Sequence, residues 1–344
     1  MDDQATSLRK LVQGKNEYAA PVSPLPTGGE AVQGRTIPAG SASSVAQPYT
    51  APPIRPLPTF RAPPPPTVPT FQPAFQKTGD ARIIAVTSGK GGVGKTNLTV
   101  NLAIALGQEG KNVIVIDADL GMANVDVILG SVSKYHLLHL LKDDISLNDV
   151  LIHGPYGVNY ISGGSAMERA VEFSPLERRR LMDKLSGCGD MADIILIDTG
   201  AGIGRNVMDF ILAADEVLLV TTPEPTALTD AYAVMKAYSM YASNKNMRLV
   251  INRVYDESES TDVITKLQRT ADRFLKMPLE SLGSIFEDRN VMNAVKRQAP
   301  LMIAYPDTLA ARCVQSIAKT MIYGGQHEVR WGWRGFLQRL LKFK

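Results

Sequence analysis

The sequence is poor in the residues that mark several classes of protein. Two cysteines in 344 residues exclude a disulfide-built fold and a metal site of four cysteines, and they are typical of a reducing compartment. No apolar run approaches the ~20 residues that a membrane-spanning helix needs, and the first residues lack the basic-then-apolar order of a secretory signal. The net charge of +3 is too small to indicate a nucleic-acid binder, so we expect no direct nucleic-acid binding. A cytoplasmic protein is expected.

Proline is concentrated in one part of the chain. Of 22 prolines, 15 lie between Pro21 and Pro73, among Gly, Ser, Thr and Ala. Such a composition buries too little apolar surface to offset its ordering entropy, which predicts a disordered linker over residues 19–79. Residues 1–18 precede it, with Ala5, Leu8, Leu11 and Val12 at helical spacing. A frayed terminus and a helix that folds on a partner both fit, and the long tether favours the partner-binding helix.

From Arg82 onward, short β-branched apolar runs alternate with helical segments. Fully apolar strands are expected where helices cover both faces of a parallel sheet. We therefore predict an α/β fold with a doubly wound, mostly parallel sheet over residues 80–325. The predicted strands are Ile83–Val86, Val113–Ile116, Val158–Ile161, Ile194–Ile197, Val217–Val220 and Leu249–Ile251.

The first predicted strand leads into a phosphate-binding loop. Gly89 followed by Gly94-Lys95-Thr96 has the required spacing, and a helix is expected over 97–108. Glycines let backbone N–H groups turn towards an anion, Lys95 reaches the β- and γ-phosphates, and the Thr96 hydroxyl binds Mg²⁺. The predicted nucleotide-binding residues are Gly89, Lys90, Gly91, Gly92, Val93, Gly94, Lys95, Thr96 and Asn97.

Carboxylates follow two of the other strands, where ligands bind in open α/β sheets. Asp117 and Asp119 end the second predicted strand, and Asp198 ends the fourth. One aspartate alone is often a turn or helix cap, but three at two strand ends beside a phosphate loop make that explanation weak.

The loop KGGVGKT is similar to the deviant Walker A motif of the ParA/MinD ATPases. The resemblance implies ATP and Mg²⁺ as cofactors, and catalytic roles for Lys90, Lys95 and Asp119. Lys90 would reach a partner's nucleotide in an ATP-bound homodimer. Asp119 would orient the attacking water, while Asp117 and Asp198 would support the metal together with Thr96.

The adenine end of the site rests on the same resemblance. Asn252-Arg253, after the last predicted strand, is similar to the family's adenine-contacting pair, and Pro306-Asp307 is a second candidate contact. An ordinary structural role in a loop explains either pair of residues equally well. The sequence has no Asn-Lys-x-Asp guanine reader, so ATP is favoured over GTP.

Three further segments narrow the resemblance to the FlhG (FleN/YlxH) family, which controls flagellar number and placement. They are residues 117–126, 198–204 and 224–232. The amino terminus is similar to that family's activator of the GTPase FlhF, with Gln4 as the helper supplied in trans. The resemblance implies FlhF as a partner, and flagellar C-ring proteins or a transcription regulator as further candidates. The activator residues are Asp3, Gln4, Ala5, Leu8 and Arg9.

Two other functions compete with this interpretation. A MinD/ParA-type ATPase that positions the division site or DNA has the same fold, but has no obvious use for residues 3–9. The other is a metabolic enzyme, such as a nucleotide-dependent ligase or reductase. An iron–sulfur reductase would need converging cysteines, whereas Cys188 is expected in a turn and Cys313 in a late helix.

Residues 326–344 predict an amphipathic helix. Its apolar face and basic opposite face are typical of a helix on anionic lipid, at the inner face of the cell membrane. Packing on its own domain is the alternative, and both hold if the helix docks in the monomer and ATP releases it. The apolar residues are Trp333, Phe336, Leu337, Leu340, Leu341 and Phe343, and the basic ones include Arg334, Arg339 and Lys342.

Overall fold

The computed structural model describes residues 81–119, 125–130, 133–164, 175–242, 246–324 and 332–342. The predicted amino-terminal helix and proline-rich linker, with the activator residues Asp3, Gln4, Ala5, Leu8 and Arg9, lie outside these ranges.

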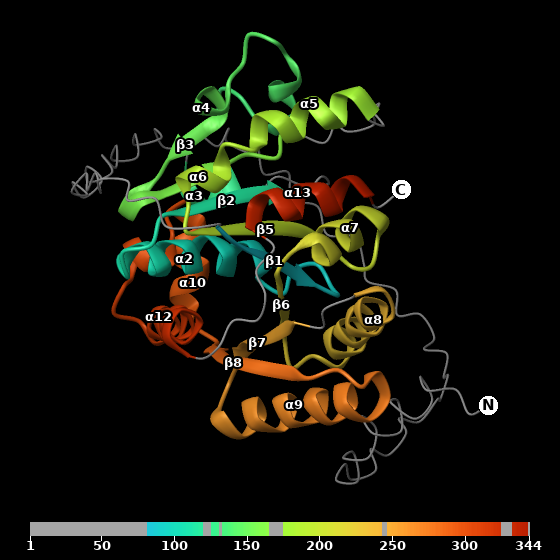
Figure 1. Cartoon of the computed structure of the whole chain (residues 1–344). Helices are drawn as coiled ribbons and strands as arrows, with labels where there is room; N and C mark the ends of the chain where they lie inside the picture. The colour runs from blue at the N-terminus through green and yellow to red at the C-terminus, as the bar shows by residue number, and fades with distance from the viewer. Residues whose placement is uncertain are drawn as a thin grey trace, which may run out of the picture. The chain divides into compact units, whose positions relative to one another are not determined.

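The core is an eight-stranded sheet in the order β3-β4-β2-β5-β1-β6-β7-β8 (Figure 1). All neighbouring strands pair in parallel except β3 and β4, which are antiparallel. The doubly wound prediction is therefore confirmed. The strands are β1 (Arg82–Ser88), β2 (Val113–Ala118), β3 (Leu151–His153), β4 (Val158–Ile161), β5 (Ile194–Ala201), β6 (Glu216–Thr221), β7 (Met247–Val254) and β8 (Leu279–Phe286).

The six predicted strands are present, and the two edge strands were missed. β3 has three residues, too few for a pattern. β8 reads LESLGSIF at the edge of the sheet, and its buried apolar residues are separated by exposed or partly exposed ones, so it has no continuous apolar run. Continuous apolar runs identify strands buried on both faces, so edge strands escape this criterion.

Helices cover both faces of the sheet, with α2 and α12 on one side and α7 and α8 on the other (Figure 1). The helices are α2 (Lys95–Gln108), α3 (Val125–Leu129), η1 (Leu137–Leu141), α4 (Leu147–Val150), η2 (Pro155–Gly157), α5 (Pro175–Leu185), α6 (Cys188–Met191), α7 (Arg205–Ala213), α8 (Pro225–Tyr241), α9 (Glu257–Thr270), η4 (Ala271–Leu275), α10 (Arg289–Lys296), α11 (Leu301–Ala304), α12 (Leu309–Tyr323) and α13 (Gly332–Lys342).

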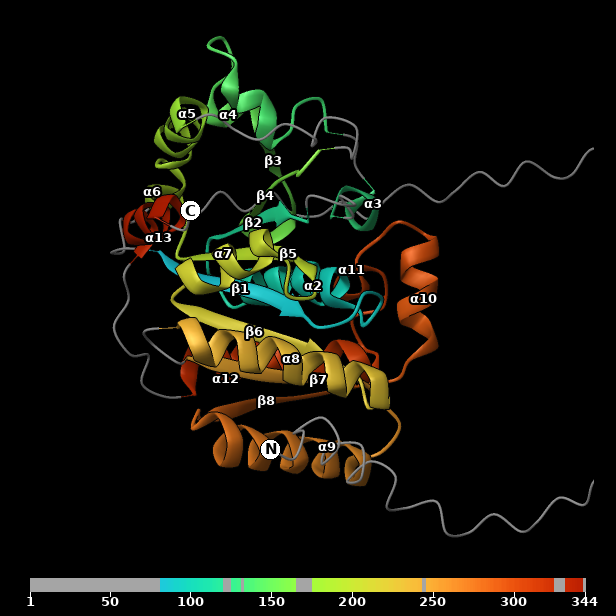
Figure 2. The same cartoon turned by 90° about the vertical axis from the view of Figure 1, so that its right-hand side faces the viewer.

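Alternate residues of the central strands feed two separate hydrophobic cores. On β1, Ile83 and Ala85 face the core under α7, α8 and α13, while Ile84 and Val86 face the core under α2 and α12. This alternation fixes the register of each strand. The parallel pairing of β1, β2 and β5 brings their carboxyl ends together at one edge. Figure 2 shows the loop before α2 at that edge.

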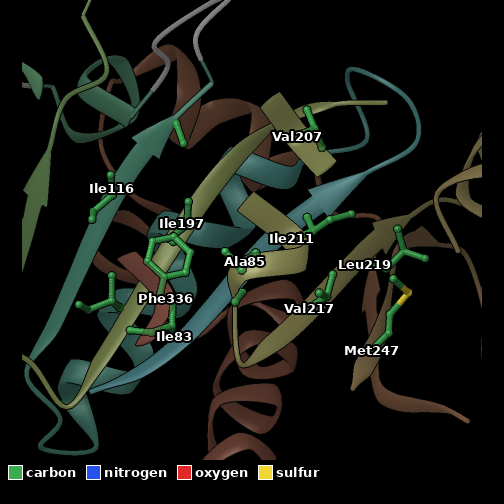
Figure 3. Close-up of a cluster of buried hydrophobic side chains, with 14 of the residues drawn as sticks. Ile83, Ala85, Ile116, Ile197, Val207, Ile211, Val217, Leu219, Met247 and Phe336 are labelled. Carbon is green, nitrogen blue, oxygen red and sulfur yellow. The ribbon is translucent and has the colours of Figure 1, made fainter. Parts of the chain in front are cut away.

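Helix α13 belongs to one of these cores. Trp333 and Phe336 are 2% and 1% exposed, and Leu337 is also buried. In Figure 3 the ring of Phe336 lies over the sheet beside Ile83 and Ile197. The alternative considered for this segment, packing on its own domain, is thus what the structure contains. None of the helices in the described ranges is long and apolar enough to cross a bilayer.

Candidate functional site

The predicted phosphate loop connects the end of β1 to the start of α2. Gly92 and Gly94 have φ angles of +81° and +91°, which side chains with a Cβ rarely adopt. Helix α2 begins at Lys95, two residues before the expected start. The loop therefore aims its backbone and the positive end of α2 at the carboxyl edge of the sheet.

Two glycines of the loop are required by close approach of other chain segments. A Cβ at Gly89 would lie 2.2 Å from the carbonyl carbon of Asp230 in α8. A Cβ at Gly94 would lie 2.3 Å from the Asn252 side-chain nitrogen. Gly91, in contrast, has open space around it. The loop is thus held between α8 and the end of β7.

Asp198 is the centre of the site. It is fully buried within β5, and its Oδ1 accepts a hydrogen bond from Lys95 Nζ at 2.9 Å. The Thr96 hydroxyl donates to Oδ2 at 2.6 Å, and the Thr99 hydroxyl donates to Oδ1 at 3.0 Å. Sequence reasoning identified Lys95, Thr96 and Asp198 but missed Thr99, which lies one helical turn after Lys95.

Asp117 is buried at the end of β2, beside Asp198 on the neighbouring strand. Burial, and then the negative charge of Asp198, raise the pKa of Asp117 to about 7. Its Oδ1 accepts from the backbone N–H of Asp119 at 3.0 Å and its Oδ2 from that of Val125 at 3.4 Å. Asp119 itself is partly exposed. Its Oδ1 lies 3.6 Å from the place that a Cβ would occupy on Gly200, two residues after Asp198. The three predicted carboxylates therefore lie at one place.

These residues fit a magnesium ion. A hydroxyl and a carboxylate oxygen, from Thr96 and Asp198, already touch, and the second carboxylate of Asp117 is adjacent. Mg²⁺ prefers such hard oxygen ligands, usually one or two carboxylates together with substrate phosphates. A dication would also relieve the repulsion that raises the pKa of Asp117.

Lys90 extends from the loop towards the start of α8. Its Nζ lies 2.9 Å from Glu224 Oε2 and 2.9 Å from the Thr226 hydroxyl. The side chains of Lys90 and Glu224 are 40% and 55% exposed, so this ion pair is accessible to water. Lys90 lowers the pKa of Glu224 by hydrogen bonding and charge. Sequence reasoning found the lysine but assigned no role to these two partners.

The predicted adenine-contacting pair makes contacts within the protein. Asn252 donates through Nδ2 to the Val93 carbonyl at 2.7 Å, so it fastens β7 to the phosphate loop. Arg253 has a φ of +61°, and its Nε donates to Glu287 Oε2 at 2.8 Å. The Glu287 carboxylate raises the pKa of Arg253. Pro306-Asp307 forms an exposed turn between α11 and α12.

The two cysteines lie on opposite faces of the sheet. Cys188 is buried in the core under α13, in helix α6 rather than in the expected turn. Cys313 lies in α12 and packs against the other core. The sheet separates the two thiols, which argues against a shared cluster.

Helix α13 is held to the domain by polar as well as apolar contacts. Trp333 Nε1 donates to the Leu185 carbonyl at 2.6 Å, and Arg339 Nη2 lies 3.2 Å from Asp215 Oδ1. Arg334 points outward, Leu340 packs partly against the core and Leu341 is half-buried. The side chain of Lys342 and all of Phe343 lie outside the described structure.

Comparisons with known proteins agree with this geometry. A family model described as "ParA: NUBPL iron-transfer P-loop NTPase" matches residues 80–322. The antiactivator FleN of Pseudomonas aeruginosa is 40% identical over 69% of this chain and 85% of its own length. The flagellum site-determining protein YlxH of Helicobacter pylori is 34% identical over 78% of this chain and 92% of its own.

A solved structure is also similar. The septum site-determining protein MinD of Pyrococcus horikoshii, complexed with Mg-ADP, is 28% identical and matches with a TM-score of 0.57. The match covers 71% of this chain and 96% of that one. The chain therefore belongs to the ParA/MinD family of P-loop NTPases and, within it, to the FlhG (FleN/YlxH) group.

Proposed function

We propose that this chain hydrolyses ATP with Mg²⁺ at the loop 89–96 and uses the ATP cycle to regulate flagellar number and placement. The observation that carries the proposal is the assembly of Lys95 and Thr96 around Asp198. A cation, a hydroxyl and a carboxylate are gathered at the positive end of α2, which is the arrangement that triphosphate hydrolysis needs.

Each group has a defined task. Lys95 turns from Asp198 to the β- and γ-phosphates, and loop N–H groups hold the remaining phosphate oxygens. Thr96 and Asp198, supported by Asp117, hold Mg²⁺, which neutralises charge on the phosphates when bound. Asp119 is partly exposed and lies near Gly200, two residues after Asp198. In this proposal it orients the attacking water. Asn252 keeps the loop fixed through its hydrogen bond to Val93.

ATP joins two copies of the chain in this proposal. Lys90 leaves Glu224 and Thr226, with which it makes exposed contacts, and completes the site of the facing subunit. Exposed ion pairs are worth about 0–1 kcal/mol, so a triphosphate competes successfully for the lysine.

The membrane is the proposed place of action, with the protein otherwise in the cytoplasm. Helix α13 docks on its own domain in the structure, and we infer that ATP-driven dimerisation releases it to anionic lipid. One such helix binds a membrane weakly, whereas two in a dimer gain from effective concentration.

The names of the relatives support a flagellar role. FleN is an antiactivator and YlxH a flagellum site-determining protein. In this proposal residues 3–9 stimulate the FlhF GTPase, and C-ring proteins or a transcription regulator are further partners. A division-site or DNA-positioning ATPase is the competing function, favoured by the fold similarity to MinD.

Asp119→Ala tests the switch. The variant should lose at least about 100-fold in ATPase rate and yet form a stable dimer in ATP and Mg²⁺, measured by light scattering. The dimer should pellet with anionic vesicles, and Lys90→Ala should stay monomeric. Asp143→Asn, in an exposed ion pair with Arg180, is the matched control. A monomeric Asp119→Ala protein in saturating ATP would contradict the switch.

FlhF stimulation separates the two candidate functions. A peptide of residues 1–15 should raise the GTPase rate of FlhF, and its Gln4→Ala version should not. Equal rates with and without the peptide would leave the division-site or DNA-positioning function as the better one.

A further inference from the structure

The surface beneath α13 is an apolar groove that buries side chains from particular positions of the helix. Its walls come from α5, α6 and α7 and its floor from β1, and together we call them the α13 groove. Trp333, Phe336 and Leu337 enter it, at relative positions 1, 4 and 5. Arg334 and Gln338, at positions 2 and 6, point to solvent. The groove thus buries three apolar side chains of the helix at this spacing, and Leu340, at position 8, packs partly against the same core.

The same pattern occurs once more in the sequence, near the amino terminus. Trp-Arg-Gly-Phe-Leu-Gln at 333–338 aligns with Leu-Arg-Lys-Leu-Val-Gln at 8–13. Apolar residues occupy positions 1, 4 and 5 in both segments. Arginine at position 2 and glutamine at position 6 are identical. The positions that fill the groove are thus matched in apolar character, and two that face solvent are matched in identity.

We propose that residues 8–13 are a second ligand of the α13 groove and compete with α13 for it. The described chain begins at Ala81, which lies in the same core cluster as Trp333 and Phe336. Residues 14–80 are thus the only tether between segment and domain. A tether of that kind gives effective concentrations in the millimolar range, so a weak ligand suffices.

The contacts predict which ligand is stronger. Leu8 and Leu11 are smaller than Trp333 and Phe336 and bury less apolar surface. Leu8 has no N–H to donate to the Leu185 carbonyl, as Trp333 does. Position 14 is glycine where α13 has Arg339, the ion-pair partner of Asp215. α13 is thus the stronger ligand, in keeping with its place in the structure.

Competition links the two ends of the chain. When α13 leaves for another surface, the groove would expose the core residues that Trp333 and Phe336 cover. Residues 8–13 then cover them, and their own apolar face is no longer available to a partner. A partner that takes residues 8–13 leaves the groove to α13.

A binding experiment without nucleotide or lipid tests the competition. The probe is a fluorescent peptide of residues 1–18, followed by anisotropy. The full-length chain carries Leu11→Asp, so that its own segment does not compete, with or without Phe336→Asp to expel α13. We expect the peptide to bind the chain with Phe336→Asp at least tenfold tighter than the chain without it. Arg339→Glu, a charge reversal opposite Asp215, is the second way to loosen α13.

The peptide carries the matched controls. Leu11→Asp in the peptide should weaken binding at least tenfold, whereas Gln13→Ala, at a solvent-facing position, should bind as the original does. The proposal would be overturned if the peptide bound equally to the chains with and without Phe336→Asp. It would also be overturned if the original peptide and its Leu11→Asp version bound equally. Dimerisation of the folded Phe336→Asp chain, checked by circular dichroism and light scattering, would overturn it as well, because a second copy would then cover the groove. Failure of the ATP switch would leave this result unchanged.

Discussion

Lys95 Nζ lies 2.9 Å from Asp198 Oδ1, and both side chains are buried, although the two residues are 103 positions apart in the sequence. In the structure Lys95, the proposed phosphate ligand, neutralises Asp198, the proposed metal support. In the proposed function, ATP and Mg²⁺ would together separate this ion pair, with Lys95 binding the phosphates and Asp198 supporting the metal.

Asp198→Ala should destabilise the nucleotide-free protein by about 3–5 kcal/mol, because it leaves Lys95 buried without its counter-charge. Urea unfolding followed by circular dichroism measures the loss. Lys95→Met combined with Asp198→Ala should recover a large part of it, since both buried charges are then absent. A double variant as unstable as the single one would contradict this explanation.

Asp117→Asn should stabilise the nucleotide-free protein at high pH only. The pKa of Asp117 is raised from 3.8 to about 7 by burial and by Asp198, so ionisation of this carboxyl opposes folding. The cost is absent below pH ~4, grows between pH ~4 and 7, and reaches about 2–4 kcal/mol above pH ~7. Unfolding free energies of the two proteins should coincide at pH 4 and differ at pH 8. A gain that is equal at both values would rule out titration as the cause.

Gly89→Ala should disrupt the loop, and Gly91→Ala should not. The first change places a methyl group 2.2 Å from the backbone of α8, which can yield only if the helix shifts. The second places it in open space at an ordinary φ angle. We expect a loss of about 2 kcal/mol or more in unfolding free energy for Gly89→Ala and less than about 0.5 kcal/mol for Gly91→Ala. ATP binding should fall in the same order.

The sequence predicts the sheet and the loop well because both depend on local pattern. The apolar runs and the spacing of Gly94-Lys95-Thr96 are written in neighbouring residues. The partners of Lys90 and Arg253 cannot be predicted in this way. Glu224 and Glu287 are distant from them in the sequence and come into contact with them only when the chain folds. For α13, the amphipathic pattern is the same whether lipid or the domain covers the apolar face. Only the three-dimensional structure shows that Trp333 packs into the core of its own domain.

The two thiols should react at very different rates. Burial raises the pKa of Cys188 to about 12 and also raises that of the half-buried Cys313. Because the thiolate is the reactive form, Cys313 should be alkylated slowly at pH 8 and Cys188 only when its core opens. Mass spectrometry after timed iodoacetamide treatment follows both, and Trp333→Ala should accelerate the labelling of Cys188. Unchanged labelling in that variant would mean that α13 does not shield this core.

Arg339→Ala should loosen α13 without unfolding the domain. Arg339 is the ion-pair partner of the buried Asp215, whose other carboxylate oxygen accepts from the Ile83 backbone at 3.2 Å. Removing a partly buried ion-pair partner should lower stability by about 1–2 kcal/mol and leave Trp333 more often in water.

Both tryptophans of the chain lie in this segment, so Trp331→Phe isolates the signal of Trp333. Acrylamide quenching of that fluorescence should increase in the Arg339→Ala protein. Arg334→Ala removes an equal charge from the exposed face of the same helix, and its quenching should match the parent. Similar increases in both variants would show that charge on the helix, and not the contact with Asp215, holds it in place.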